Sequence, residues 1–379
     1  MNKIILFLFL VLLFKAEAQN ASALTVSKKA DSLFEIGVYN KAIPYFLEAK
    51  RYREVARSYE AIGNNSKARK YFQKALFKNK ENPKTQFEYV KLLVKLSRYK
   101  EADSVLQNLQ SRFPDNSNFV YKRGLIKEAQ NDSTAIEYYK QVYLLDTNHI
   151  NSTYKIARNH IENRKFVESE AYINKGLVAD STSIRFLNLL ALKQFYTKDY
   201  HEAIVTYSKL IIRGAGNIQI HENLASCYSN TYQFEKALHQ FEILLTEYDD
   251  KNAKWHLEIA GLYRSLKEYK KAERHLNIAI ALQEIPLSKS YMGLAKVFKA
   301  QKDYKNEMEA LKSALSNNPN NEMALYSMAI AADNYFADKK LVLGYYEAYL
   351  RKYAENGKMR NLAKHRVADL KNELHFTTD

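Results

Sequence analysis

The chain has 379 residues, a net charge of +16 and a hydrophobic content of 46%, which is too high for a disordered protein. It contains only 10 glycines and 5 prolines, which argues against an all-β fold because hairpin corners need such residues. The abundance of Lys, Glu, Ala and Leu favours helices, so composition predicts an all-α protein.

The first 18 residues have the pattern of a secretory signal peptide. Lys3 precedes the uninterrupted apolar run Ile4–Phe14, and Ala16 and Ala18 supply the small residues of a cleavage site. The run is too short to cross a bilayer comfortably, although an uncleaved anchor is an alternative. We therefore expect an exported protein with no transmembrane segment once residues 1–18 are removed.

The single cysteine, Cys227, excludes an intramolecular disulfide. An exported protein without disulfides fits a bacterial periplasm or cell envelope. Usage rich in Lys, Asn, Tyr and Ile is typical of an AT-rich bacterial genome. We expect Cys227 itself to be a small, buried, apolar side chain, because it lies within a predicted helix.

Residues 19–50 contain the first copy of a helical pattern. Tyr39, Ala42, Phe46 and Ala49 stand at offsets that mark one face of a helix. The next copy, centred on Ala68, follows Ala42 by only 26 residues. We therefore predict that 19–50 is a truncated or irregular first repeat.

Between residues 51 and 350 the pattern recurs at intervals of 33 to 35 residues. Its small residue stands at Ala68, Ala102, Ala135, Ser169, Ala203, Ala237 and Ala272, and Glu307 continues the register. About twelve residues earlier in each unit a second series of mostly small residues occurs, at Ala56, Val90, Gly124, Ala157, Ala191, Ala225, Ala260 and Ala295. Each unit is thus predicted to be a pair of helices that buries its apolar faces only against neighbouring units.

The last segment, 351–379, predicts a capping helix. Lys358 to Phe376 is amphipathic, and a solenoid end needs a cap because its last unit would otherwise expose an apolar face. The residues that we expect on the buried face are Leu362, Val367, Leu370 and Leu374.

This pattern resembles the tetratricopeptide repeat (TPR) family, as in Tyr269, Ala272, Leu276 and Ala279. The resemblance implies an all-α, right-handed superhelical solenoid of about nine to ten helix–turn–helix units with a C-terminal capping helix. It also implies that the first helix of each unit lines a concave face that binds extended peptides or partner helices. With the predicted export, it indicates a bacterial multi-repeat protein, of Bacteroidetes type.

Motifs for catalysis are missing from the sequence. No HExxH, GxxxxGK[ST] or GxSxG occurs, and one cysteine cannot make a cysteine-rich zinc site. Gly214 and Gly216 are better explained as an inter-repeat turn than as a dinucleotide loop. We expect no cofactor, no metal and no enzymatic activity, since the short inter-helix loops leave little room for a catalytic site.

The positive charge is concentrated in the N-terminal third. From Lys50 to Lys100 there are fifteen Lys or Arg residues against four Glu, a net charge of +11. The resemblance would place the following cations along the groove: Arg53, Arg57, Lys84, Lys91 and Lys95. Four tyrosines on predicted first helices fall outside the packing positions and are further candidate contacts: Tyr121, Tyr154, Tyr196 and Tyr326.

These observations predict a non-catalytic scaffold or adaptor of the bacterial envelope that binds an acidic protein or peptide partner. One alternative is a binding module for an anionic glycan or another acidic envelope polymer, which the basic N-terminal third would attract. Another is that this block is an ordinary solvated, Lys-rich surface. Nucleic acid would also suit the charge, but export argues against it.

Overall fold

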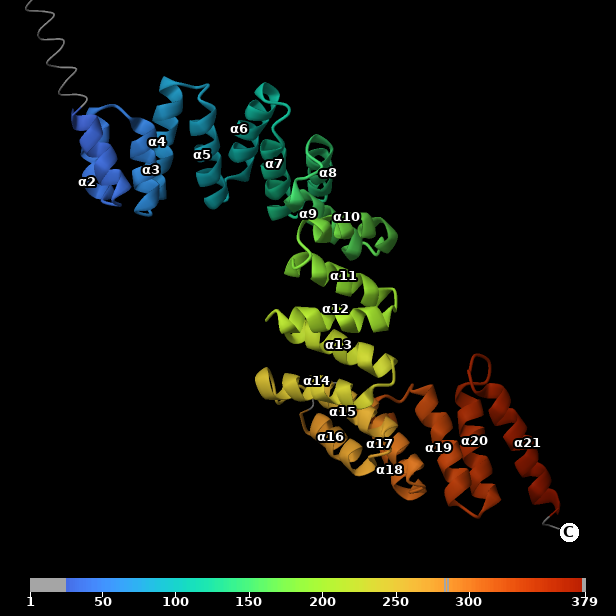
Figure 1. Ribbon diagram of the computed structural model, residues 1–379. Coiled ribbons are helices and arrows are strands. Elements are labelled where there is room, and N and C mark those ends of the chain that lie inside the picture. The colour runs from blue at the N-terminus through green and yellow to red at the C-terminus, as the bar shows by residue number, and fades with distance from the viewer. Residues whose placement is uncertain (1–24, 283, 285, 377–379) are drawn as a thin grey trace, which may run out of the picture. The chain divides into compact units, whose positions relative to one another are not determined.

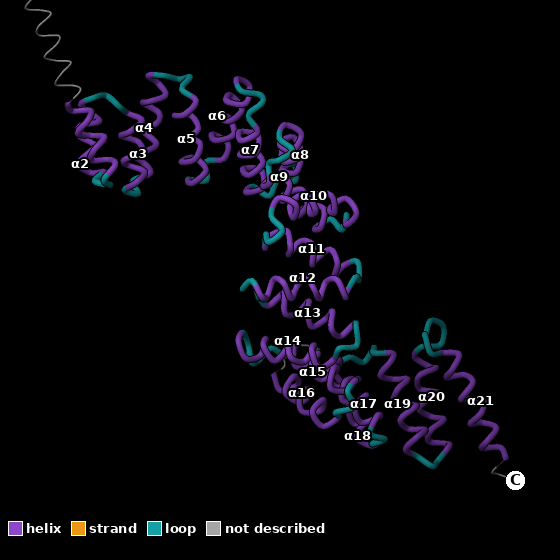
Figure 2. Tube along the Cα trace, viewed as in Figure 1, coloured by secondary structure: helices purple, strands orange, loops and turns teal. Residues whose placement is uncertain are grey.

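The computed structural model describes residues 25–282, 284 and 286–376, so the predicted signal peptide over 1–18 lies outside the described residues. Across these ranges the chain consists of α-helices and short loops, with no β-strand (Figures 1 and 2). The chain divides into two compact units, Met1–Asp180 and Ser181–Asp379. The prediction of an all-α repeat solenoid is confirmed.

From residue 25 onward, the first unit contains five antiparallel helical hairpins. The first hairpin joins a helix over 25–35 to α2 (Tyr39–Glu48). The next four pair α3 (Tyr52–Ala61) with α4 (Asn65–Lys78), α5 (Pro83–Lys95) with α6 (Tyr99–Arg112), α7 (Ser117–Ala129) with α8 (Ala135–Leu145), and α9 (Ile150–Glu162) with α10 (Phe166–Ala179). Both α2 and α3 have only 10 residues, which accounts for the short interval between Ala42 and Ala68.

The described residues of the second unit form five more hairpins and one further helix. The hairpins pair α11 (Ile184–Tyr196) with α12 (Tyr200–Ile212), α13 (Ile218–Asn230) with α14 (Phe234–Glu247), α15 (Ala253–Ser265) with α16 (Tyr269–Leu282), α17 (Leu287–Ala300) with α18 (Tyr304–Asn317), and α19 (Glu322–Tyr335) with α20 (Lys339–Lys352). The final helix, α21 (Arg360–Phe376), packs against α20.

The repeated small residues hold the hairpins together. Ala102 and Ala203 on second helices and Ala157 and Ala225 on first helices are all 0% exposed. Small side chains at these positions let neighbouring backbones approach, while large residues such as Phe72 fill the space between them. Burying one such large side chain contributes about 1.5–3 kcal/mol.

The turn inside every described hairpin except α19–α20 contains one residue in the left-handed conformation. Glycine supplies it in the first two turns, where Gly37 and Gly63 both have φ of +79°. In later turns the same position carries residues with a side chain, for example Lys198 with φ of +67° and Lys302 with φ of +61°. Such residues rarely adopt this conformation, so these turns contain modest local strain.

The C-terminal helix forms, but the prediction that Leu362 lies on its buried face is wrong. Leu370 is 0% exposed and Val367 is partly buried, whereas Leu362 is 58% exposed. The position nearest the core is instead Ala363, also 0% exposed. Because 363, 367 and 370 are spaced by four and three residues, they share one helix face, and Leu362 lies beside it.

Candidate binding surfaces on the first helices

Surface pockets occur between successive first helices within each unit. In the first unit a pocket of about 300 Å³ lies between α7 and α9, near the start of α8. In the second unit, pockets of about 380 Å³ and 280 Å³ lie between α13 and α15 and between α15 and α17. The first helices therefore present a series of open depressions, and these helices also carry the predicted contact residues.

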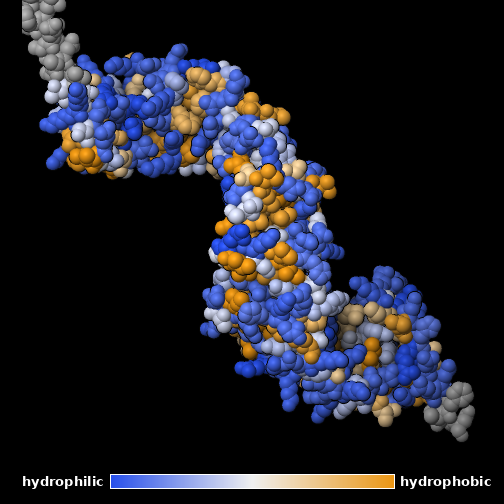
Figure 3. All heavy atoms as spheres, in the orientation of Figure 1, coloured by the Kyte–Doolittle hydropathy of each residue, from blue (hydrophilic) through white to orange (hydrophobic). Residues whose placement is uncertain are grey.

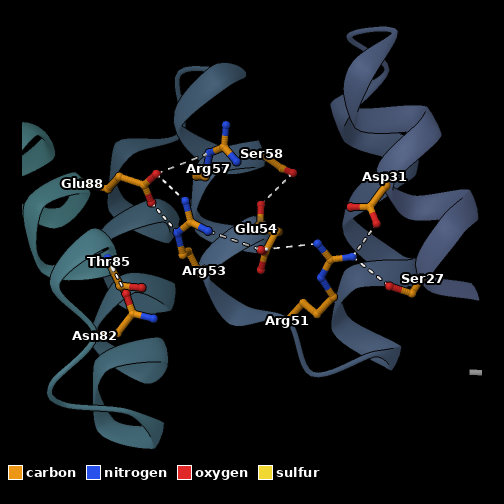
Figure 4. A network of polar contacts seen from close by, with 10 residues as sticks. All are labelled: Ser27, Asp31, Arg51, Arg53, Glu54, Arg57, Ser58, Asn82, Thr85 and Glu88. Carbon is orange, nitrogen blue, oxygen red and sulfur yellow. Dashed lines mark hydrogen bonds and ion pairs between the residues drawn. The ribbon is translucent and has the colours of Figure 1, made fainter. Parts of the chain in front are cut away.

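At the N-terminal end of this surface Arg53 on α3 is paired with Glu88 on α5 (Figure 4). The Arg53 Nε and Nη2 atoms donate hydrogen bonds of 2.6 and 2.5 Å to the two Glu88 carboxylate oxygens. This two-point geometry is the strong form of a guanidinium–carboxylate contact. Hydrogen bonding to Glu88 raises the pKa of Arg53.

Neighbouring charges extend this pair into a network (Figure 4). Glu54 lies 3.4 Å from Arg51 and 3.6 Å from Arg53. Arg51 also donates a hydrogen bond of 2.7 Å to Asp31, and this bond raises the pKa of Arg51. The network ties the first three hairpins together and compensates two of the basic charges that the sequence contributes here.

Arg57 makes a weaker contact with this network than Arg53 does. Its Nε lies 4.0 Å from Glu88, its guanidinium stands over the Phe34 ring at 4.8 Å, and its side chain is 40% exposed. Of the two predicted groove arginines, Arg53 is thus held by an internal carboxylate, while Arg57 keeps part of its charge open to a ligand.

The three predicted lysines all lie exposed on α5: Lys84, Lys91 and Lys95. Lys91 stands over the Phe87 ring at 5.2 Å. Asn82 caps the helix by accepting a hydrogen bond of 3.0 Å from the Thr85 backbone amide, which fixes the start of α5 (Figure 4). No carboxylate in the described part of the chain forms an ion pair with these lysines, so they form the accessible part of the basic block.

The predicted tyrosines differ in exposure. Tyr121 is half-buried and packs against Tyr139 and His149, with ring centroids 5.6 and 4.7 Å away. Tyr326 is half-buried against Tyr349, and this burial raises its pKa. Tyr154 is also half-buried, whereas Tyr196 is 48% exposed. Tyr196 is therefore the most accessible of the four.

The pocket between α7 and α9 is lined by charged groups that already pair. Lys155 donates hydrogen bonds of 2.7 Å to both carboxylate oxygens of Glu128. Burial alone would raise the pKa of Glu128, but the hydrogen bonds from Lys155 and Tyr139 outweigh it, and the pKa is lowered. Arg158 and Glu162 form a second pair of 2.7 Å on the same side.

The pocket between α13 and α15 was missed by the sequence analysis. Glu222 accepts hydrogen bonds from Trp255 Nε1 at 2.7 Å and from Lys254 Nζ at 3.3 Å. Asn223, on the same helix, donates a hydrogen bond of 2.9 Å to the Tyr207 hydroxyl. The only tryptophan of the chain was an available signal, since it stands early in a predicted first helix, one turn before Ile259 and Ala260.

Apolar side chains reach solvent at one repeated position of the second helices, nine residues after the buried small residue. These residues are Phe77 (94% exposed), Leu144 (82%), Val178 (88%) and Ile212 (82%). Figure 3 shows apolar patches on a face of the molecule that is otherwise largely hydrophilic.

Two kinds of functional feature are absent from the described residues. Within residues 25–282, 284 and 286–376, no group of three or more His, Cys, Asp or Glu side chains is arranged to hold a metal ion. Over the same residues, no helix combines the length and the apolar character needed to cross a membrane.

Antiparallel helical hairpins that pack side by side, with open depressions between their first helices, define a helical-repeat scaffold. The tetratricopeptide repeat family model matches residues 288–321, which span α17 and α18. The described residues thus form an all-α, TPR-like solenoid, and one of its hairpins matches the tetratricopeptide repeat family.

One solved structure supports this fold, and two others are reported beside it as more distant similarities. The C-terminal part of a TPR repeat-containing protein from Cytophaga hutchinsonii aligns with a TM-score of 0.51 and 15% identity, covering 63% of this chain and 98% of that one. A tetratricopeptide repeat protein from Parabacteroides merdae gives a TM-score of 0.45 and 15% identity, with 66% and 98% coverage. Yeast Tom70 gives 0.42 and 14% identity, with 95% and 98% coverage. A search of curated proteins finds no match.

Proposed function

We propose that this chain is a non-catalytic scaffold that holds protein or peptide partners along its first-helix surfaces and acts in a bacterial cell envelope after export. Scaffolds of this fold are usually non-catalytic. The observation that carries the proposal is the recurrence of pockets between successive first helices, at α7/α9, α13/α15 and α15/α17. Depressions repeated along an open surface suit an extended partner, which can place one side chain in each of them.

The envelope part of the proposal rests on the pattern of residues 1–18. Its test is to express the full chain in a Gram-negative host, fractionate the cells and sequence the N-terminus of the product. Cleavage after Ala18 together with recovery in the periplasmic or envelope fraction is expected. A chain that keeps residues 1–18 and stays with cytoplasmic proteins would contradict the export step.

The binding part is tested by crosslinking in intact cells, followed by affinity purification of the tagged chain from envelope fractions and mass spectrometry. We expect at least one protein to be recovered with the chain and to be absent from a mock purification. Recovery of the chain alone, in repeated experiments, would contradict a protein-binding scaffold.

A second candidate is supported by the three exposed lysines of α5. Lys84, Lys91 and Lys95 would attract an anionic glycan of the envelope by long-range electrostatics. Dextran sulfate is a suitable probe, and its binding should weaken steeply as salt rises from about 0.05 to 0.5 M, because the Debye length shortens from about 14 to 4 Å. Binding that is indifferent to salt, or absent at low salt, would remove this candidate.

A further inference from the structure

The pocket between α15 and α17 differs from the other two in being apolar. It has a volume of about 280 Å³. Its floor is formed by buried residues and its walls by partly buried ones, namely Ala260, Leu276, Val297, Leu257 and Met292. The α15 and α17 helices, which are neighbours in Figure 1, contact each other directly, and residues of both line the pocket.

Glycine shapes this pocket on both helices. A Cβ placed on Gly261 of α15 would meet no atom within 4 Å, so a side chain at this position would occupy the pocket itself. A Cβ on Gly293 of α17 would come within 2.7 Å of a Leu276 methyl group, so glycine here allows the close approach of α17 to that side chain. Glycine in a helix costs about 0.5–1 kcal/mol relative to alanine, so the open space at Gly261 carries a cost in stability.

The rim of the pocket is positively charged. Arg264, Lys289 and Lys296 line it, all three are exposed, and no carboxylate is among the lining residues. None of the three forms an ion pair with another described residue. Lys289 and Lys296 are seven residues apart on α17, which places their backbones about 10 Å apart, one toward each end of the apolar floor.

The one uncharged polar side chain that lines the pocket, that of Asn321, already makes two hydrogen bonds. Its side-chain oxygen accepts a hydrogen bond of 3.1 Å from the Ala324 backbone amide. Its amide nitrogen donates a hydrogen bond of 3.2 Å to the Ser288 hydroxyl. The inside of the pocket therefore offers apolar contact, and the charge acts only at the rim.

We propose that this pocket takes one large aliphatic or aromatic side chain of an extended peptide segment, and that carboxylates on neighbouring residues of that segment pair with Arg264, Lys289 and Lys296. The inference rests on the proposed scaffold function and specifies the partner at one of its sites. The volume is just below the range of about 300–1,000 Å³ found for small-molecule sites, which suits a single side chain.

The test uses the full-length chain and two fluorescent peptides. The first carries one leucine with two glutamates on each side, and the second has serine in place of the leucine. Fluorescence anisotropy should give affinities that differ by roughly ten- to hundredfold in favour of the leucine peptide, because serine forfeits the burial of the apolar side chain. Equal affinities, or no measurable binding of the leucine peptide, would overturn the inference.

The substitution Gly261→Leu fills the pocket and should lower the affinity for the leucine peptide by at least about tenfold. The matched control is Gly344→Leu on α20, an exposed helical glycine whose Cβ would also meet nothing within 4 Å. Both substitutions favour the helix, so both variants should fold, and the control should bind as the wild type does. Unchanged binding by Gly261→Leu would exclude the pocket as the site.

Lys289→Glu combined with Lys296→Glu tests the rim. This variant should bind the leucine peptide much more weakly at low salt, and its affinity for the peptide should depend less on salt. An unchanged affinity would show that the rim does not select carboxylates. If Gly261→Leu still recovers the same partners from envelope fractions, the pocket assignment fails while the scaffold function stands.

Discussion

Arg53 and Glu88 stand 35 residues apart in the sequence and form a two-point ion pair between α3 and α5. Their side chains are 19% and 21% exposed, so the pair is partly shielded from water. It fixes one first helix against the next in the region where positive charge is greatest. The same carboxylate lies 4.0 Å from Arg57, so it restrains both predicted groove arginines.

Glu88→Gln should therefore lower stability and raise affinity for anions at once. Loss of the partly shielded pair should cost about 1–2 kcal/mol in the free energy of unfolding, measured by urea denaturation. The released Arg53 and Arg57 should increase the affinity for dextran sulfate at low salt. Glu81→Gln is the control, because Glu81 is exposed and its carboxylate forms no ion pair within the described residues; it should leave stability unchanged.

Glu307 on α18 occupies the position that a small residue fills in earlier repeats. It is 2% exposed, its Oε2 atom is buried without a hydrogen-bond partner, and burial raises the pKa of its carboxyl group. Glu307→Ala should stabilise the second unit by about 1 kcal/mol at pH 7, since the gain from removing a buried carboxylate exceeds the loss of a favourable charge in the first turn of a helix. Glu309→Ala, at an exposed position of α18, should change stability little.

The effect of Glu307→Ala should depend on pH. A carboxyl group whose pKa is higher in the folded than in the unfolded chain destabilises the wild type above the folded pKa. This cost falls as pH drops through the folded pKa and disappears below the unfolded pKa. The stability difference between the variant and the wild type should thus shrink on acidification, and a difference that grows would contradict the burial of an ionised Glu307.

The left-handed turn residues predict opposite effects for the same substitution at two nearby lysines. Lys302 has φ of +61° in the turn before α18, so Lys302→Gly should stabilise the chain by about 0.5–1 kcal/mol. Lys312 is exposed within α18, and Lys312→Gly should destabilise it by a similar amount. Thermal unfolding followed by circular dichroism would compare the two, and a shift of the same sign would contradict this account.

Cys227 should report on opening of the second unit. It is 0% exposed, and burial raises the pKa of its thiol to about 12. A thiol-specific reagent at pH 8 should therefore react with the native chain orders of magnitude more slowly than with the chain in urea. Rapid, stoichiometric labelling without denaturant would show that α13 is not packed as described.

The fold was predictable because its signal is periodic. Residues such as Ala102, Ala203 and Phe72 recur at fixed offsets, and the requirement for close helix packing acts on each copy in the same way. At the end of the chain the period is lost, and there the prediction for Leu362 failed. Without a neighbouring copy to set the register, the buried face of α21 depended on where the helix begins.

The binding surfaces were harder to predict than the fold, because the charge of a residue does not show which other residue it pairs with. Arg53 and Lys91 are both basic residues on predicted first helices, yet Arg53 meets Glu88 across the helix pair while Lys91 remains exposed. The pocket beside Gly261 could not be predicted for a related reason. It exists because glycine leaves space on α15, and that space becomes a pocket only where α17 packs beside it.

The central claim is that partners bind along the first helices. Lysine crosslinking of the tagged full-length chain in cells tests it most directly, because exposed lysines lie on both kinds of helix. Partner crosslinks should concentrate on first-helix lysines such as Lys84, Lys91 and Lys95, with few on Lys70 and Lys78 of the second helix α4. Crosslinks concentrated on α4, or spread evenly over both sets, would contradict it.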